Sequence, residues 1–372
     1  MGTDAGDRLF ADDVLTRRER VERTLLHRPV DRVALHDQVS YNPGVVARYT
    51  GRRVRGFDYT LEDVCTVIRS TLDACFPPVA PRGTGRITTP DGFVIQHDNW
   101  TSWTVSRPFS DVAGAREWVL RATESMRRRS RDAEAARLAF REQMQALQSK
   151  VGGTVIIDTG SQVGLCSCWS QVGLALFAYL YDDDPACVSE FIEAETEFQV
   201  WRAGAIGDPE LSPVILIADD FATKQGPIFS PGFLQAEHFP RLKRVVEAWH
   251  GAGLQVLYHS DGNWKAVIPQ LVECGVDGFY CLEPAVGMDI VRLAREWPDR
   301  VWAGGVDGVD LMERGEPEQV RAEVARQVRQ TDALHGGGVF IGTSSEINPQ
   351  VKADNYVAMV EAVGELRNTR LR

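Results

Sequence analysis

The sequence predicts an α/β protein built on a (β/α)8 TIM barrel, with an N-terminal helical extension and an inserted β-hairpin. Short apolar runs alternate with longer amphipathic segments in the C-terminal half, as in consecutive strand–helix units. These runs are continuously apolar, which is typical of strands buried on both faces of a parallel sheet. Seven strands are visible and an eighth is expected before residue 151, so the count fits the barrel. A doubly wound open sheet is the alternative.

The predicted strands are short runs of apolar residues. They cover residues 32–36, 154–158, 214–219, 254–259, 278–282, 301–305 and 338–342. Amphipathic segments with apolar residues three and four positions apart predict the helices. The predicted helices cover residues 11–26, 61–74, 132–150, 185–205, 232–250, 265–274, 288–297, 316–334 and 353–366. Strand and helix alternate regularly from residue 214 to the end, which indicates successive βα units.

Residues 77–112 do not fit this alternation. Two β-rich segments, 86–89 and 93–97, flank the tripeptide Pro90-Asp91-Gly92, and Asp-Gly between two such segments is a strong hairpin signal. We therefore predict a hairpin insertion at about 77–112 that lies over the barrel, after a helical extension at 1–30. The 372 residues are expected to form one domain, because barrels of this size fold as single units.

The composition excludes several function classes. Lys and Arg number 41 and Asp and Glu number 52, which gives a net charge of −11. This acidic balance argues against a nucleic-acid or membrane-surface protein, because both need a basic field. No apolar run approaches the roughly 20 residues of a membrane span, and the polar N-terminus does not resemble a signal peptide. The seven cysteines are not paired like a disulfide framework. A cytoplasmic protein is expected.

Polar residues follow most of the predicted strands, where the active site of a (β/α)8 barrel lies. The expected catalytic residues are His36, Asp37, Asp219 and Asp220. Adjacent residues on a strand face opposite sides, so only one of the last two is expected to enter the pocket. The expected substrate-binding residues are Asp158, Asn263, Ser345 and Trp100. Trp100 is expected to contribute to an aromatic lid over the substrate. The alternative is that it packs within the inserted hairpin.

The segment His259-Ser-Asp261 is the sharpest local feature. A histidine at a strand end and an aspartate two residues later can point at one centre, and Glu283 follows the next strand. With Glu346, this set predicts a divalent metal site for zinc, iron or manganese. Such a cation would also relieve the repulsion among converging carboxylates. The alternative is that His259 and Asp261 bond to each other or cap the next helix.

The chain resembles the uroporphyrinogen decarboxylase/cobamide-dependent methyltransferase superfamily from about Arg17 to its end. The similar segments, in the family's order, are residues 17–33, 219–231, 259–263, 275–284, 304–307 and 348–355. They include His259-Ser-Asp-Gly-Asn263 and Leu282-Glu-Pro284. The resemblance implies a (β/α)8 barrel.

The resemblance favours the methyltransferase branch. Decarboxylases of the superfamily carry an Arg-Gln-Ala-Gly-Arg signature near the first strand, and residues 36–41 contain no arginine. The methyltransferases hold zinc with a His-x-Cys pair and a later cysteine, and use it to activate a thiol. His259 matches that histidine, and Glu283 matches a glutamate that approaches the zinc. Asp261 and Ser345 stand where the cysteines would be. The resemblance therefore implies a metal site with hard oxygen ligands in place of the soft thiolates.

Three functions follow from the sequence. The first is a metal-assisted methyltransferase for a small molecule, working with a separate corrinoid protein because the chain lacks a D-x-H-x-x-G motif. The second is a decarboxylase or carbon–carbon lyase for a non-porphyrin substrate, with Asp37 or Asp219 stabilising a cationic intermediate. The third is a catalytically silent barrel that binds a small ligand or a corrinoid protein. Barrels of this superfamily often form homodimers, so a homodimer is expected.

Overall fold

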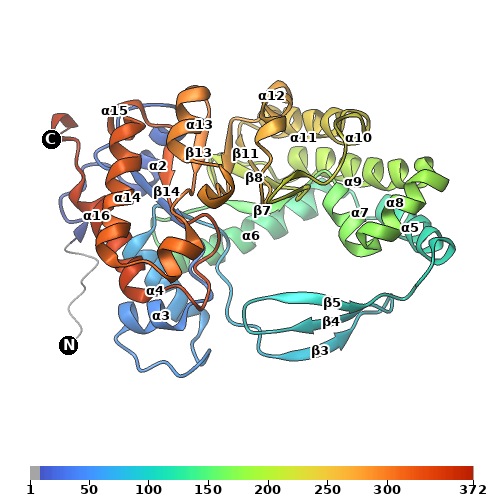
Figure 1. The fold of residues 1–372 in the computed structure, drawn as a ribbon, viewed down its shortest axis with the longest axis horizontal. Helices are drawn as coiled ribbons and strands as arrows, with labels where there is room; N and C mark the ends of the chain where they lie inside the picture. Colours follow the sequence, from blue (N-terminus) through green and yellow to red (C-terminus); the bar gives the residue numbers. More distant parts are fainter. Residues whose placement is uncertain (1–8, 372) are drawn as a thin grey trace.

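A single parallel sheet organises the structure, a computed structural model that describes residues 9–371. Its strands are β1 (Ala34–Asp37), β2 (Ala74–Cys75), β6 (Val155–Ile156), β7 (Asp158–Ser161), β8 (Val214–Ala218), β11 (Gln255–His259), β12 (Gly278–Tyr280), β13 (Val301–Ala303) and β14 (Val339–Ile341). Their order is β6-β2-β1-β14-β13-β12-β11-β8-β7, and most of them can be followed in Figure 1. All pairs are parallel.

The sheet closes into an eight-stranded barrel. Its two end strands, β6 and β7, are consecutive in the chain and are separated only by Ile157. The backbone N–H of Ile157 donates to the carbonyl of Cys75 at 2.8 Å, so residues 155–161 act as one strand that bonds to β2 and then to β8. The predicted fold class is confirmed. The eighth strand is β2, which overlaps the end of the helix predicted at 61–74.

Helices cover the outside of the barrel. They are α2 (Arg17–Leu25), α3 (Pro43–Thr50), α4 (Leu61–Thr71), α5 (Val112–Arg127), α6 (Ala133–Val151), α7 (Leu165–Val172), α8 (Leu174–Asp183), α9 (Pro185–Ile206), α10 (Pro231–Phe233), α11 (Phe239–Gly251), α12 (Ile268–Glu273), α13 (Ile290–Glu296), α14 (Pro317–Gln330), α15 (Ala333–Gly336) and α16 (Ala353–Glu365). Short 3-10 or π turns add η1 (Leu234–His238), η2 (Lys265–Val267), η3 (Pro284–Val286), η4 (Gly308–Glu313) and η5 (Thr369–Leu371). Between residues 9 and 371, none of the helices has the length and apolar character that crossing a membrane requires.

Four helices were not predicted. α3 and α7 span only eight residues each, which is too short to show a clear helical period. α8 is apolar around most of its circumference, so its sequence shows no helical period either. α5 lies between the predicted hairpin insertion and the helix predicted at 132–150, where no element was predicted. At the N-terminus, the helix predicted from residue 11 begins at Arg17, because Thr16 and Glu19 form a reciprocal capping box. Residues 1–8 of the predicted extension lie outside the described residues.

The inserted segment is a three-stranded sheet on an arm, defined here as residues 77–111. The predicted hairpin is present as β3 (Gly85–Thr88) and β4 (Val94–His97), and β5 (Ser102–Ser106) adds a third antiparallel strand. The arm projects beside the barrel (Figure 1), and β3 is exposed along its whole length. The following helix, α5, anchors this unit to α9 and its preceding loop. The ion pairs are Arg116–Asp184, Arg127–Glu190 and Arg129–Glu195, at 2.6, 3.4 and 3.2 Å.

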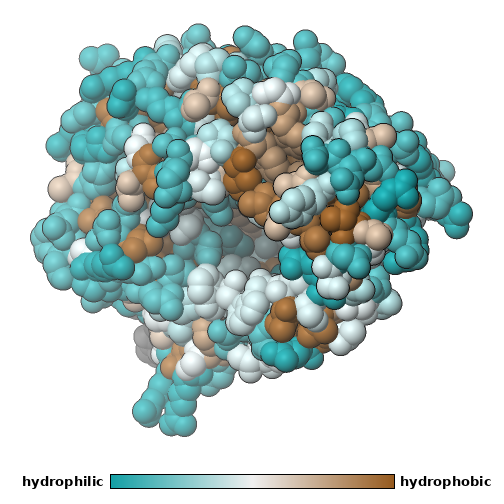
Figure 2. All heavy atoms as spheres, turned by 45° about the vertical axis from the view of Figure 1, so that its right-hand side comes forward, coloured by the Kyte–Doolittle hydropathy of each residue, from teal (hydrophilic) through white to brown (hydrophobic). Residues whose placement is uncertain are grey.

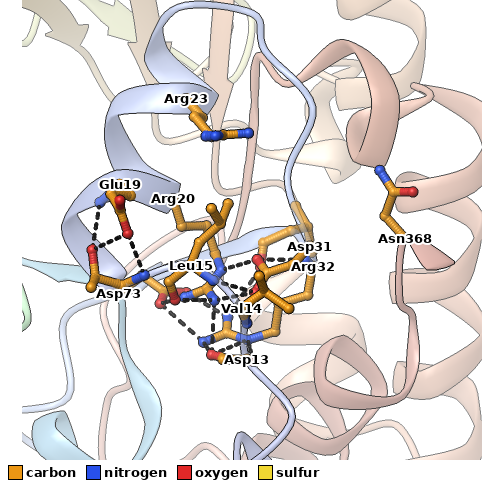
Figure 3. Close-up of polar contacts among 12 residues, drawn as sticks. Asp13, Val14, Leu15, Glu19, Arg20, Arg23, Asp31, Arg32, Asp73 and Asn368 are labelled. Atoms are coloured by element: carbon orange, nitrogen blue, oxygen red, sulfur yellow. Dashed lines mark hydrogen bonds and ion pairs between the residues drawn. The ribbon is translucent and has the colours of Figure 1, made fainter. Parts of the chain in front are cut away.

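A buried ion cluster lies below the first two strands (Figure 3). Arg20 of α2 reaches Asp31 at 2.8 Å and Asp73 at 2.7 Å, and Arg32 reaches Asp73 at 2.6 Å. Both guanidinium groups and Asp73 are at most 1% exposed. Asp73 also accepts the backbone N–H of Leu35 at 2.8 Å. The cluster therefore fixes α2 and the start of β2 against β1.

We expect Asp73→Asn to destabilise the fold by about 3–5 kcal/mol, because it removes the fully buried carboxylate of the cluster and leaves the two guanidinium groups only Asp13 and Asp31 as ion-pair partners. Urea unfolding at pH 7 measures the change. The control is Asp310→Asn, which removes an exposed partner of Arg314 and should change stability by less than about 1 kcal/mol. Equal stability of the two variants would show that the cluster does not hold the fold.

The same cluster predicts acid sensitivity. Burial raises the pKa of Asp73, but Arg32 and Arg20 outweigh it and hold that pKa below its ordinary value. A depressed folded-state pKa stabilises the protein above the unfolded-state pKa of about 3.9, and this stabilisation is lost as pH falls. The stability difference between wild type and Asp73→Asn should therefore be constant above about pH 5 and shrink below pH 4. A difference that grows on acidification would contradict this.

Candidate functional site

A cavity of about 450 Å³ opens at the carboxyl ends of the barrel strands. Its apolar wall includes Phe76, Leu216 and Tyr280, and its polar groups include His259 and Glu346. Figure 2 shows the surface hollowed near the centre of that view, with apolar and polar side chains around the hollow. A concave site with few polar groups on an apolar wall is the usual form of a small-molecule site.

Three potential metal ligands meet in the wall of this cavity. Ligand atoms of His259, Asp261 and Cys281 all lie within 4.8 Å of one another. The thiol of Cys281 donates to Asp261 Oδ1 at 3.1 Å and to the carbonyl of Ser344 at 2.8 Å. His259 Nε2 lies 3.8 Å from Asp261 Oδ1, and His259 Nδ1 is buried without a partner among the described residues.

This donor set fits zinc. Zinc takes nitrogen, sulfur and carboxylate oxygen ligands, and three protein ligands leave a position for substrate. Burial and the neighbouring Asp261 raise the pKa of the Cys281 thiol well above its ordinary value, so the thiol is protonated unless a cation is nearby. No other group of three or more such side chains meets this distance criterion within residues 9–371.

The third member of the cluster is Cys281, whereas the sequence predicted Glu283. Glu283, expected as a ligand, instead accepts the backbone N–H of Gly262 at 2.7 Å and supports the loop after β11. Cys281 lies nearer because it directly follows β12, in a left-handed conformation with φ of 70° that turns the chain at the cavity. The signal for Cys281 was its place at the end of a predicted strand, but its type alone indicated only a small buried residue.

Asp219 and Asp220 have different partners, and neither is among the residues that line the cavity. Asp219 is 1% exposed and accepts the backbone N–H groups of Val163, Gly164 and Cys166, so it caps the start of α7. Burial raises its pKa to about 6. Asp220 lies 3.5 Å from His259 Nε2 and accepts the N–H of Asp261 at 2.8 Å. Only Asp220 therefore touches the cluster.

His36 and Asp37 lie below the cavity. His36 is 2% exposed, with its ring against Phe76 and Tyr280 at centroid distances of 4.6 and 5.0 Å. Burial lowers its pKa to about 3, and neither ring nitrogen has a partner among the described residues. Asp37 accepts from the hydroxyl and the N–H of Thr343, which ties β1 to the end of β14, and burial raises its pKa to about 7. Neither residue lines the cavity.

Of the predicted substrate-binding residues, only Ser345 lines the cavity. Ser345 lines the cavity together with Glu346, the fourth predicted metal ligand. Asp158 does not line it, because its carboxylate pairs with Arg202 of α9 at 2.6 Å while Thr159 faces the cavity. The remaining two also lie outside the cavity lining. They are Asn263, which accepts the N–H of Lys265, and Trp100, between β4 and β5 on the arm.

The loop after β11 depends on Gly262. Its φ is +81°, and an added Cβ would lie 2.6 Å from the carbonyl oxygen of Thr223. Thr223 belongs to β9 (Ala222–Thr223), which pairs with β10 (Gly226–Pro227). The same carbonyl accepts the N–H of Asn263 at 2.8 Å. This close approach holds Asp261 in place beside His259.

We expect Gly262→Ala to displace the loop and to lower the melting temperature, because alanine adds both a positive-φ penalty and a backbone clash. The control is Gly204→Ala in α9, where an added Cβ meets nothing within 4 Å. That change should be neutral or stabilise by up to about 1 kcal/mol. Calorimetry of both variants measures the effect, and an unchanged Gly262→Ala protein would refute the tight-loop interpretation.

Comparison with known proteins supports the family resemblance. Residues 195–366 match the uroporphyrinogen decarboxylase (URO-D) family, and this range contains Asp220, His259, Asp261 and Cys281. No curated protein matches the chain. A solved methyltransferase from Methanosarcina mazei is similar in fold, with a TM-score of 0.64 and 16% sequence identity over 94% of this chain and 99% of that one. Residues 195–366 are thus similar to the uroporphyrinogen decarboxylase family, and the fold of the chain is similar to that of the solved methyltransferase.

Proposed function

We propose that the protein is a metal-assisted methyltransferase that acts on a small molecule bound at the barrel mouth. The observation that carries this proposal is the His259, Asp261 and Cys281 cluster in the cavity wall. A nitrogen, an oxygen and a sulfur donor on one side of an open cavity resemble a catalytic zinc site with a free position. The solved methyltransferase of the same fold adds support.

The side chains of the site have distinct roles in this proposal. His259, Asp261 and Cys281 would hold the metal, and Asp220 positions the Asp261 backbone by accepting its N–H. When bound, zinc supplies Lewis acidity, which lowers the pKa of a thiol, hydroxyl or water so that it reacts as a nucleophile. Glu346 lines the cavity, and in this proposal it accepts the proton that the acceptor loses.

The methyl donor in this proposal is a separate corrinoid protein, and the compartment is the cytoplasm. The seven cysteines of the chain are free thiols, and a thiol ligand such as Cys281 requires reducing conditions. A homodimer is compatible with the proposal but adds no residue to it.

The geometry gives the alternatives less support. The decarboxylase or lyase alternative relies on Asp37 or Asp219, but both carboxylates accept backbone N–H groups and neither lines the cavity. The silent barrel would have a filled mouth, whereas this mouth is open over about 450 Å³. Methyl transfer therefore remains the function that the site supports best.

Elemental analysis tests the metal site directly. We expect about one equivalent of zinc per chain in the wild type and its loss in His259→Ala and Cys281→Ser, because each change removes one of three ligands. The control is Cys187→Ser, which removes a buried thiol outside the cluster and should retain the metal. Cobalt substitution should add a sulfur-to-cobalt charge-transfer band in the wild type that is absent in Cys281→Ser.

Activity separates methyl transfer from the alternatives. With methylcobalamin as the probe donor, loss of its methyl group should depend on added acceptor and disappear in His259→Ala. A wild-type protein that binds no zinc, iron or manganese after reconstitution would refute the metal-assisted mechanism. A protein that binds metal but does not consume methylcobalamin with any acceptor would favour metal-assisted lyase chemistry.

A further inference from the structure

The cavity has a cation on its wall that the proposed chemistry does not use. Arg82 is the only lysine or arginine among the described residues that line it. It lies on the arm between β2 and β3, where its backbone N–H donates to the carbonyl of Asn99 at 3.3 Å. Its guanidinium forms no ion pair or hydrogen bond with residues 9–371. Arg82 is an exposed residue of the cavity lining, so a ligand that enters the cavity can reach its guanidinium.

The cavity lining carries charges of both signs. Two neutral groups with hydrogen-bond donors, Gln38 and Tyr41, line it together with Arg82, and Gln38 Nε2 lies 3.4 Å from the Tyr41 oxygen. Carboxylates line it at Asp261 and Glu346. An anionic ligand would be repelled by these carboxylates and attracted to Arg82, which fixes the orientation in which it binds.

We propose that Arg82, supported by Tyr41 and Gln38, binds the carboxylate of a small organic acid whose second, neutral functional group faces the metal cluster. A guanidinium matches a carboxylate with two parallel hydrogen bonds. One cation beside two acidic residues suits a monoanion better than a doubly charged phosphate. The apolar side chains of Phe76 and Leu216 would cover the body of the acid. This inference deepens the proposed function by naming its substrate class.

Calorimetric titration with a matched probe pair tests the proposal. 3-Phenylpropionate carries the carboxylate and 3-phenylpropanamide is its neutral counterpart. We expect the wild type to bind the acid at least tenfold more tightly than the amide, and Arg82→Gln to lose that preference. The control is Arg86→Gln, an exposed residue of β3 outside the cavity lining, which should keep the preference. Added salt should weaken the binding of the acid but leave the binding of the amide unchanged.

Three results would overturn the proposal. They are equal binding of acid and amide by the wild type, no saturable binding of the acid, and an unchanged preference in Arg82→Gln. His259→Ala distinguishes this proposal from the metal site: it should lose metal but retain the preference for the acid. If His259→Ala abolishes acid binding while Arg82→Gln does not, the carboxylate binds the metal instead and the Arg82 subsite is refuted. Melting temperatures of all variants verify that they are folded.

Discussion

The fold depends on the pairing of buried guanidinium groups with Asp73 below the barrel. Burying these charges is costly, and only mutual pairing with additional hydrogen bonds compensates for it. Because Asp73 also accepts the Leu35 N–H, the charge pairing and the start of the β1–β2 ladder form together. This matters for β2, which has only two residues in its ladder. Because the ladder between β1 and β2 begins at this fixed point, it also sets the positions of the side chains at the carboxyl ends of the two strands.

Much of this structure is predictable from the sequence because its regular elements have strong patterns. The strands after residue 213 are continuous apolar runs, and the predicted hairpin has its Asp-Gly turn. Other features have no local pattern. The strand β2 is too short to show a period, and α8 is apolar on most sides. Cys281 reaches the cluster through a positive φ angle, which the sequence of a non-glycine residue does not reveal.

The acidic residues that follow the barrel strands have two different roles. Asp219 and Asp37 accept hydrogen bonds from backbone N–H groups, so these carboxyl groups hold loops together. Asp220 and Asp261 lie beside His259 instead. The sequence predicts a carboxylate at each of these positions, but it does not show which carboxylates already have backbone partners. That distinction depends on the path of the loop before α7, which only the three-dimensional structure reveals.

The arm leaves the barrel at the cavity and carries Arg82 at its base, whereas the cluster comes from strands more than 170 residues later in the chain, at 259–281. In the proposed function, recognition by Arg82 and reactivity at the cluster are therefore encoded in separate stretches of the gene. Insertions or replacements between β2 and α5 can alter which compound is selected while the barrel keeps its reactive centre. Such a division makes the arm a natural site for divergence among relatives, and a practical segment to exchange when the specificity of this scaffold is to be redesigned.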